Sequence, residues 1–404
     1  MVTYIIAGLF FVLATASSYS QNTEWIRYFG GDTQQSTTTG DLILRTSDSS
    51  IVVIGNEKVG TGAGRMSIVI TKLTFSGDTL WTRRLYGRYG AMAAGVYEMD
   101  NGNYVIGGRE REENYTFPEN YWQPMLAAIK PNGDSVWKRT YPAPRYNPNL
   151  DHKNIGNRFV SLLATDNGHT LMLNRINGVH YVLKVDAIGR SVSGKVLYME
   201  SHTLRHMRRR ENRVIEIPYT RGVEVGIMRL NDSADTLGST ALLREIAPGS
   251  SSLIDVLPTP EDGYLIGAYT SWNIRGTDKN SVYLARTDSG GAMIADTLWN
   301  MNRFFDEPLV LNSIRQMKNG GYVMATSDTG AIWVTNADIT GFTKVSTIEK
   351  WIPTVAVDNM DGSVLVTGSQ VVNGVQRGFI AKIKLPVSSV RGSDYLLPSR
   401  MDLW

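Results

Sequence analysis

The side chains best suited to chemistry or ligand binding are concentrated in a few polar insertions of the 404-residue chain. General acid–base catalysis uses carboxylate and imidazole groups, which could come from Glu110, Glu112, Glu113, Asp151 and His152. The same insertions carry arginines and aromatic rings, which suit stacking on sugar rings or peptide side chains. The candidate ligand-binding residues are Arg109, Glu110, Tyr115, Tyr121, Trp122, Tyr146, Asp151, His152, Trp272 and Arg275.

Composition narrows the classes of function. The chain has no cysteine, which excludes disulfides, thiolate metal ligands and cysteine nucleophiles. A net charge of +3 gives no global field that would favour nucleic acid. His202 and His206 share a strand face without a third ligand, so no metal site is predicted, and no motif indicates a cofactor or assigns a catalytic residue.

One basic stretch stands out from this balanced background. It contains Arg205, His206, Arg208, Arg209, Arg210 and Arg213. Alternation along a strand would place Arg208 and Arg210 on one side, which makes an anion-binding patch one interpretation. A hairpin tip surrounded by water explains the same charges more simply.

The N-terminus resembles an export signal. Residues 4–16 form an uncharged apolar run, too short to span a bilayer, followed by small and polar residues. The pattern allows cleavage after Ala16 or after Ser20, and the second site, which leaves Gln21 first, is favoured. The alternative is a buried N-terminal strand. No other segment is apolar enough to cross a membrane, so the sequence predicts a secreted or cell-surface protein that does not span the membrane.

A repeated motif indicates the architecture that must position these residues. Asp78-Thr79-Leu80-Trp81 recurs at 134–137 and 296–299, and without its tryptophan at 235–237. Within each unit, β-rich runs are joined by Asn-Gly or Asp-Gly turns, which predicts two hairpins and therefore a four-stranded antiparallel sheet. The second strand of the unit is predicted at 51–55, 104–108, 170–173, 214–217, 264–267, 322–325 and 364–368. The third is predicted at 68–72, 125–130, 181–186, 225–230, 282–287, 333–338 and 379–384.

The seventh unit lacks a fourth strand, because the chain reaches Pro386 and the pattern stops. Residues 24–30 resemble a fourth strand and precede the first unit, so they would complete the seventh and close a ring. The fold class is therefore all-β: a seven-bladed β-propeller over residues 21–386, with 1–20 as signal peptide and 387–404 as a tail. An open solenoid, or six or eight blades, remain alternatives. The tryptophans at 25, 81, 137, 299 and 351 are placed on the outer strand, packing between blades.

The repeat unit, with its Lys-Leu or Lys-Val-Asp third strand, Gly-Asp turn and tryptophan-containing fourth strand, resembles the propeller repeats of proteins secreted by the type IX system. The resemblance covers residues 22–386 and implies export without naming an activity. In such proteins a tail like 387–404 leads to a C-terminal sorting domain, which this sequence does not contain. A truncated product or another export route would each account for that.

Loop lengths predict which side of the ring carries function. The predicted long insertions, at 56–66, 109–122, 143–157 and 271–280, all belong on one face, whereas the opposite face has short turns. The asymmetry favours a non-catalytic recognition or scaffold module that binds an extracellular glycan or protein through this long-loop face. The alternative is a propeller carbohydrate-active enzyme, which would bring carboxylates within roughly 5–10 Å of each other at the channel mouth.

Overall fold

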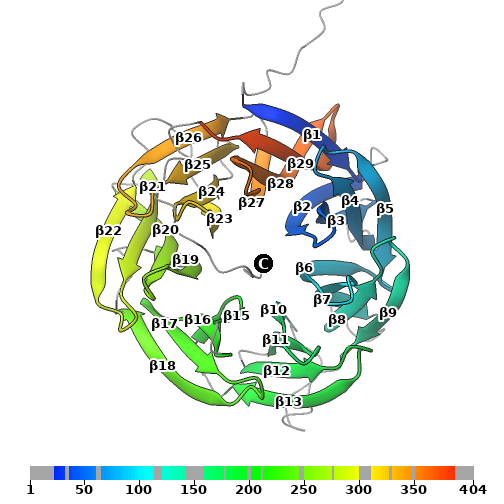
Figure 1. Cartoon of the computed structure of the whole chain (residues 1–404), viewed down its shortest axis with the longest axis horizontal. Helices are drawn as coiled ribbons and strands as arrows, with labels where there is room; N and C mark the ends of the chain where they lie inside the picture. Colours follow the sequence, from blue (N-terminus) through cyan, green and yellow to red (C-terminus); the bar gives the residue numbers. More distant parts are fainter. Residues whose placement is uncertain are drawn as a thin grey trace, which may run out of the picture.

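Apolar strands and glycine turns fold into seven antiparallel sheets arranged as blades around a central axis (Figure 1). The structure is a computed structural model. It describes residues 22–31, 36–60, 65–112, 121–141, 158–176, 179–197, 202–210, 213–244, 250–274, 277–299, 311–326, 330–347 and 351–386. The regular elements of these residues are all β-strands, and none of them forms a helix long and apolar enough to cross a membrane.

Each blade places its first strand at the channel and its fourth at the outer rim (Figure 1). Blade 1 contains β2 (Ser36–Arg45), β3 (Ser50–Val59), β4 (Arg65–Thr74) and β5 (Thr79–Tyr86). Blade 2 contains β6 (Ala91–Glu98), β7 (Tyr104–Glu112), β8 (Tyr121–Ile129) and β9 (Ser135–Thr140). Blade 3 contains β10 (Arg158–Ala164), β11 (Thr170–Ile176), β12 (Val179–Val185) and β13 (Ser191–Leu197).

Blade 4 differs because its inner strand is split in two. It contains β14 (His202–Leu204), β15 (Arg208–Arg209), β16 (Ile215–Arg221), β17 (Glu224–Leu230) and β18 (Thr236–Leu243). Blade 5 contains β19 (Ser250–Pro258), β20 (Tyr264–Ile274), β21 (Thr277–Thr287) and β22 (Met293–Trp299). Blade 6 contains β23 (Leu311–Gln316), β24 (Tyr322–Thr326), β25 (Ala331–Thr335) and β26 (Phe342–Thr347). Blade 7 contains β27 (Trp351–Asp358), β28 (Ser363–Val372), β29 (Val375–Lys384) and β1 (Thr23–Phe29).

The ring closes through the N-terminal strand. Strand β1 pairs antiparallel with β29, with Ile26 opposite Ala381 and Tyr28 opposite Phe379, and Figure 1 shows the two strands side by side. Lys382 reinforces the seam through an ion pair with Glu24 at 2.8 Å. The predicted seven blades and the predicted closure are therefore confirmed.

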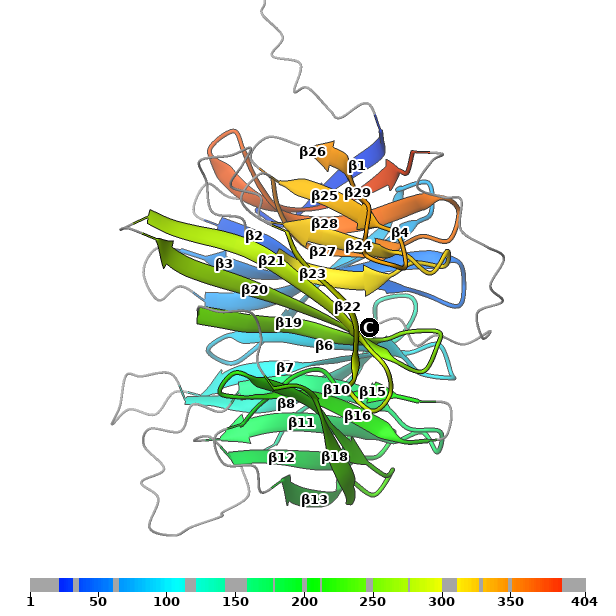
Figure 2. The same ribbon diagram turned by 90° about the vertical axis from the view of Figure 1, so that its left-hand side faces the viewer.

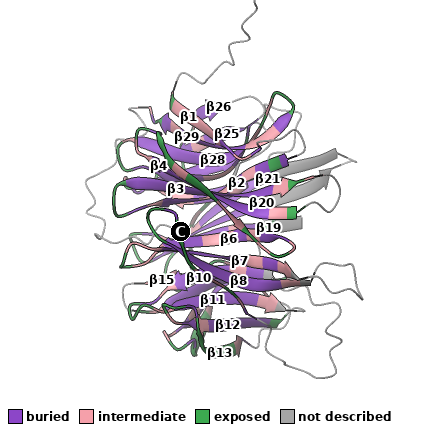
Figure 3. Cartoon of the chain, turned by 90° about the vertical axis from the view of Figure 1, so that its right-hand side faces the viewer, coloured by how far each residue is buried: buried purple, intermediate pink, exposed green. Residues whose placement is uncertain are grey.

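The hydrophobic core is divided among the blade interfaces. Seven clusters of buried side chains lie between neighbouring blades, and each draws on both. The cluster between blades 7 and 1 includes Phe29 from β1 and Ile380 from β29, so the closing strand contributes to the last interface. Figure 3 shows the buried residues along the strands of successive blades, while the exposed residues lie mainly at turns and on the rim. Stability therefore depends on every blade having two neighbours.

Outer-strand tryptophans pack against the next blade, as predicted. Trp81 lies over Gly133, in the turn between the third and fourth strands of blade 2, and a Cβ there would come within 3.1 Å of the indole. The indole of Trp81 also donates to the carbonyl of Pro131 at 2.9 Å. Trp137 lies against Gly189 of blade 3 in the same way. Glycine is needed at these turns because an added methyl group would collide with the ring.

The prediction for Trp351 was wrong. This residue begins β27, an inner strand, instead of lying on an outer strand. It is 2% exposed, and its ring stacks on Phe379 with centroids 4.1 Å apart. The fourth strand of blade 6, β26, ends at Thr347, four residues before Trp351.

The motif at 296–299 is also out of phase with the other copies. The turn of blade 5 is closed by a hydrogen bond from Asp288 N to the carbonyl of Ala292, where blade 1 uses Thr74 N and Asp78. Ala292 therefore occupies the place of Asp78, and the fourth strand starts before the predicted aspartate. Trp299 instead pairs with Val282, further along the strand.

Two of the predicted long insertions are extended hairpins. Strands β20 and β21 remain paired out to Ile274 opposite Thr277, so most of 271–280 is strand. In blade 1, β3 and β4 stay paired to Val59 opposite Arg65. Figure 2 shows β20 and β21 reaching beyond the end of β19. The long-loop face, defined as the side where second strands end and third strands begin, therefore projects as paired strands at these two blades.

Candidate functional site

The described residues include only part of the predicted ligand-binding set. The side chains of Arg109, Glu110 and Trp122 are described, at the long-loop ends of β7 and β8. Tyr121 begins β8 and Trp272 lies in β20, but their side chains are outside the description. The remaining predicted residues lie outside the described part of the chain: Tyr115, Tyr146, Asp151, His152 and Arg275.

A cavity of about 270 Å³ opens where blades 2, 3 and 4 meet. Its walls come from β6, β10 and β14 at the channel, and from β7, β11 and β12 behind them. In the β6–β7 pairing Met92 lies opposite Arg109, and in the β11–β12 pairing Arg175 lies opposite His180. Both pairs are near the loops that join second to third strands, so the cavity belongs to the long-loop face.

The Arg109 guanidinium forms one side of the cavity. It lies over the Trp122 ring, 4.7 Å from the ring centroid, and donates to the Met92 sulfur at 3.4 Å. Arg109 and Trp122 were both predicted from the sequence, and the structure brings them together. Stacking on the indole restrains the guanidinium, so the position of the Arg109 charge at the cavity wall is fixed.

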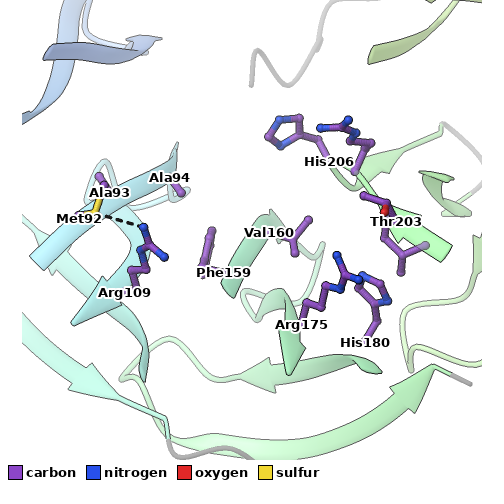
Figure 4. A pocket seen from close by; sticks show the side chains of 12 residues that line it. Met92, Ala93, Ala94, Arg109, Phe159, Val160, Arg175, His180, Thr203 and His206 are labelled. Carbon is purple, nitrogen blue, oxygen red and sulfur yellow. Dashed lines mark hydrogen bonds between the residues drawn. The ribbon is translucent and has the colours of Figure 1, made fainter. Parts of the chain in front are cut away.

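Arg175 and His180 form the opposite side (Figure 4). The His180 side chain is fully buried, and neither ring nitrogen has a hydrogen-bond partner among the described residues. Burial, followed by the nearby Arg175 charge, lowers the pKa of His180 to about 4, so its ring is neutral at pH 7. Within the described chain Arg175 has no ion-pair partner. Neither residue was among the ligand-binding residues predicted from the sequence.

The split inner strand of blade 4 supplies the third side. After β14 ends at Leu204, the backbone of Arg205 donates to Pro218 at 2.8 Å, and that of Met207 to the Ser161 hydroxyl at 3.0 Å. These bonds give partners to two backbone N–H groups where the inner strand is interrupted. Arg205 and His206 line the cavity at this point. The described residues of the cavity wall thus include three arginines and two histidines, and none of them bears a side-chain carboxylate.

Arg208, Arg209 and Arg210 form ion pairs within blade 4 and with its neighbours, so the interpretation as a water-surrounded hairpin tip was wrong for these three residues. Arg208 contacts Asp255 at 2.5 Å, and Arg210 contacts Glu216 at 2.9 Å. Arg209 pairs with Asp166 and Asp232. These three arginines are mostly buried, with side chains 10–22% exposed. Because separate carboxylates neutralise them, Arg208 and Arg210 do not form a shared anion patch.

Glu110 is engaged in a contact between blades. It is 6% exposed, accepts the backbone N–H of Arg88 at 2.7 Å and pairs with Lys138 at 3.0 Å. Blade 1 repeats this arrangement, since Glu57 accepts the N–H of Gly31 and pairs with a basic residue of its own fourth strand. In both places the carboxylate fixes the segment that connects one blade to the next.

Replacing Glu110 by alanine should lower the free energy of unfolding by about 2 kcal/mol, because a charged hydrogen-bond acceptor is lost while Lys138 can still reach water. Glu57→Ala at the equivalent place should cost a similar amount. Urea denaturation of both variants measures the effect. Changes below about 0.5 kcal/mol, the level of an ordinary surface substitution, would contradict the structural role.

His180 makes an acid-dependent contribution to stability. The unfolded chain takes up a proton on this residue below pH 6.5, whereas the folded chain does so only near pH 4. Stability should therefore fall as the pH falls through this window, by roughly 3 kcal/mol from His180 alone. Unfolding of the natural chain and of His180→Leu, compared at pH 7 and pH 4, isolates the effect. Parallel pH profiles for the two proteins would refute it.

Metal-ligand groupings of three or more His, Cys, Asp or Glu do not occur among the described residues. The cavity therefore suits binding of a polar or anionic group by its arginines. Its chemistry differs from the paired carboxylates that glycoside hydrolysis uses.

Comparison with known proteins supports the fold. No family model matches the sequence, and no curated protein matches it. The structure is similar to YCF48 from Cyanidioschyzon merolae, with a TM-score of 0.53 and 10% identity over 89% of this chain and 98% of that one. YCF48 bound to D1 peptide gives a TM-score of 0.51 and 12% identity over 90% and 100%. A protein of unknown function from Dyadobacter fermentans gives 0.44 and 11% over 89% and 99%. At these identities the likeness establishes a β-propeller.

Proposed function

We propose that this protein is an exported, non-catalytic recognition module that binds a protein or glycan through its long-loop face. The observation that carries the proposal is the cavity between blades 2, 3 and 4, lined by Arg109, Arg175 and Arg205. Concave sites with a few convergent polar groups are the usual form of ligand sites. A rigid ring that holds such a site among its blades suits recognition.

Two considerations favour binding over acid–base chemistry. Glycosidases place a pair of carboxyl groups about the scissile bond, whereas none of the cavity-lining residues that the structure describes is an aspartate or a glutamate. Glu110, the predicted acid next to Arg109 in the chain, already accepts a hydrogen bond from the backbone of Arg88 and forms an ion pair with Lys138. YCF48 is bound to D1 peptide in one of the similar structures, and this makes protein the first class of ligand to test here.

Export is the second part of the proposal. It rests on the apolar run at 4–16, the small residues before Gln21 and the resemblance to type IX secreted repeats. Expression of the full chain in a Gram-negative host, followed by intact mass measurement, tests it. A mature protein that begins at Gln21 outside the cytoplasm supports export, and an uncleaved cytoplasmic chain contradicts it.

The binding part is tested by screening the purified full chain on glycan and peptide arrays. Trp122→Ala removes the ring beneath Arg109, and Trp272→Ala removes an aromatic group predicted on the same face. Arg190→Ala is the matched control, because Arg190 closes a turn on the opposite face of blade 3. We expect array ligands whose binding falls at least tenfold in the tryptophan variants and is unchanged in the control. Equal binding by all variants would place recognition elsewhere.

A further inference from the structure

We propose that the cavity binds a carboxylate group carried on an apolar stem, an inference that rests on the proposed binding function of the long-loop face. The group would enter between Arg109 and Arg175, which lie on opposite sides of the cavity (Figure 4). The apolar stem would contact the side chains of Phe159 and Val160 between them.

Charge is the first argument. Three arginines line a cavity of about 270 Å³, and none of the described residues in its wall is an aspartate or a glutamate. Arg109 is oriented by Trp122, and Arg175 lacks an ion-pair partner in the described chain. An anion that enters beside Arg175 gives this guanidinium a counter-ion in a partly enclosed space, where the attraction between opposite charges is stronger than in open water. Arginine forks also match the planar geometry of a carboxylate.

The orphaned ring of His180 is the second argument. A buried polar group without a hydrogen bond is unusual in a native structure, and its cost is removed when a ligand supplies the partner. His180 is neutral, so it carries one N–H donor that can reach a carboxylate oxygen beside Arg175. A cavity that combines an unpaired guanidinium with an unsatisfied donor is suited to an oxygen anion.

The remaining lining selects the stem. Phe159 and Leu204 are almost completely buried in the wall, and Met92 and Val160 add further apolar surface. Among the described lining residues, Thr203 alone carries a hydroxyl group. A sugar acid would bury several hydroxyl groups here without partners, whereas an aliphatic or aromatic stem would not. The size of the cavity suits a single residue-sized group.

The test uses small probes of matched shape. The full chain is titrated with 3-phenylpropionate and with 3-phenylpropionamide, with thermal shift and calorimetry as readouts. We expect the acid to bind at least tenfold more tightly than the amide, because charged hydrogen bonds are lost in the amide. A tetrapeptide ending in phenylalanine, as free acid and as C-terminal amide, distinguishes a polypeptide end from a free small acid. D-Glucuronate tests the sugar acid.

Variants locate the binding. Arg175→Gln keeps a polar side chain and removes its charge. It should lower the affinity for the acid at least tenfold without changing the affinity for the amide. Arg190→Gln removes a charge of the same kind from the opposite face. Its affinity for the acid should stay within twofold of that of the natural chain. Circular dichroism of each variant confirms folding. If Arg175→Gln fails to fold, Arg175→Lys, which keeps the charge but loses the fork, should give a smaller loss of the same kind.

The outcomes separate this inference from the proposed function. Equal binding of acid and amide, or tighter binding of glucuronate, overturns the carboxylate-on-a-stem inference. Array ligands that depend on Trp122 and Trp272, together with no binding of any acid, overturn the inference and leave the recognition function standing. Acid binding that depends on Arg175, with no array ligand, supports the inference for small acids and overturns recognition of a macromolecule.

Discussion

Removal of residues 22–31 should open the ring and lower the free energy of unfolding by about 5 kcal/mol or more, because several apolar side chains lose their burial at roughly 1.5–3 kcal/mol each. The segment contains β1, whose Ile26 and Tyr28 pack on the cluster between blades 6 and 7, and whose Phe29 is buried between blades 7 and 1. The loss is comparable with the whole stability of many domains, about 5–15 kcal/mol.

Removal of β1 also exposes the edge of the strand that it pairs with. Without β1, the third strand of blade 7 becomes an exposed edge from Gly378 to Ile383, and such edges pair with other chains. The deletion variant should therefore unfold at a lower urea concentration and aggregate on gel filtration. A chain that begins at Gln21 is the control and should behave as a monomer of full stability. Identical urea midpoints for the two chains would contradict closure by β1.

Asp255→Ala should be the most destabilising of the single substitutions considered, at about 3–5 kcal/mol, because it leaves two largely buried arginines without a counter-ion. Asp255 is 1% exposed on the inner strand of blade 5. It contacts Arg208 of blade 4 at 2.5 Å and Arg315 of blade 6 at 2.8 Å. One carboxylate thus joins the inner strands of three consecutive blades around the channel.

The ionised form of Asp255 is the one that stabilises. Burial opposes ionisation, but Arg208 and Arg315 together hold the pKa of Asp255 below its usual range. Its contribution is therefore present above the ordinary aspartate pKa and is lost as the pH falls through the lowered value. The control is Asp78→Ala, which removes a 72% exposed carboxylate 4.0 Å from Arg27 and should cost less than about 1 kcal/mol. Equal losses in the two variants, measured by urea denaturation at pH 7, would refute the argument.

The fold was largely predictable because its signals are local and repeated. Turn glycines and period-two apolar runs identified the second and third strands of all seven blades, and the missing fourth strand predicted closure by β1. Errors arose where a local motif was ambiguous. The repeat motif at Asp296–Trp299 has the same sequence pattern as the other copies, but the turn that precedes the fourth strand lies earlier, at Asp288–Ala292. Trp351 matched the aromatic pattern, yet tertiary packing on Phe379 placed it on an inner strand.

The candidate site was less predictable because three blades assemble it. Arg109 and Trp122 were found because they flank a polar insertion within one blade. Arg175 and His180 are single polar residues in otherwise apolar strands, and no spacing distinguishes them before the strands pair. Arg205 and His206 were noticed within the basic stretch, but the sequence does not show that the inner strand is split there. Charges that converge from three separate blades leave no local motif.

The most direct test of recognition through the cavity is a crystal structure of the full chain bound to the tightest ligand from the array screen. We expect the ligand to occupy the cavity between β6, β10 and β14, within hydrogen-bonding distance of Arg109 or Arg175. A ligand bound at the short-turn face or on the outer strands, with the cavity unoccupied, would contradict it.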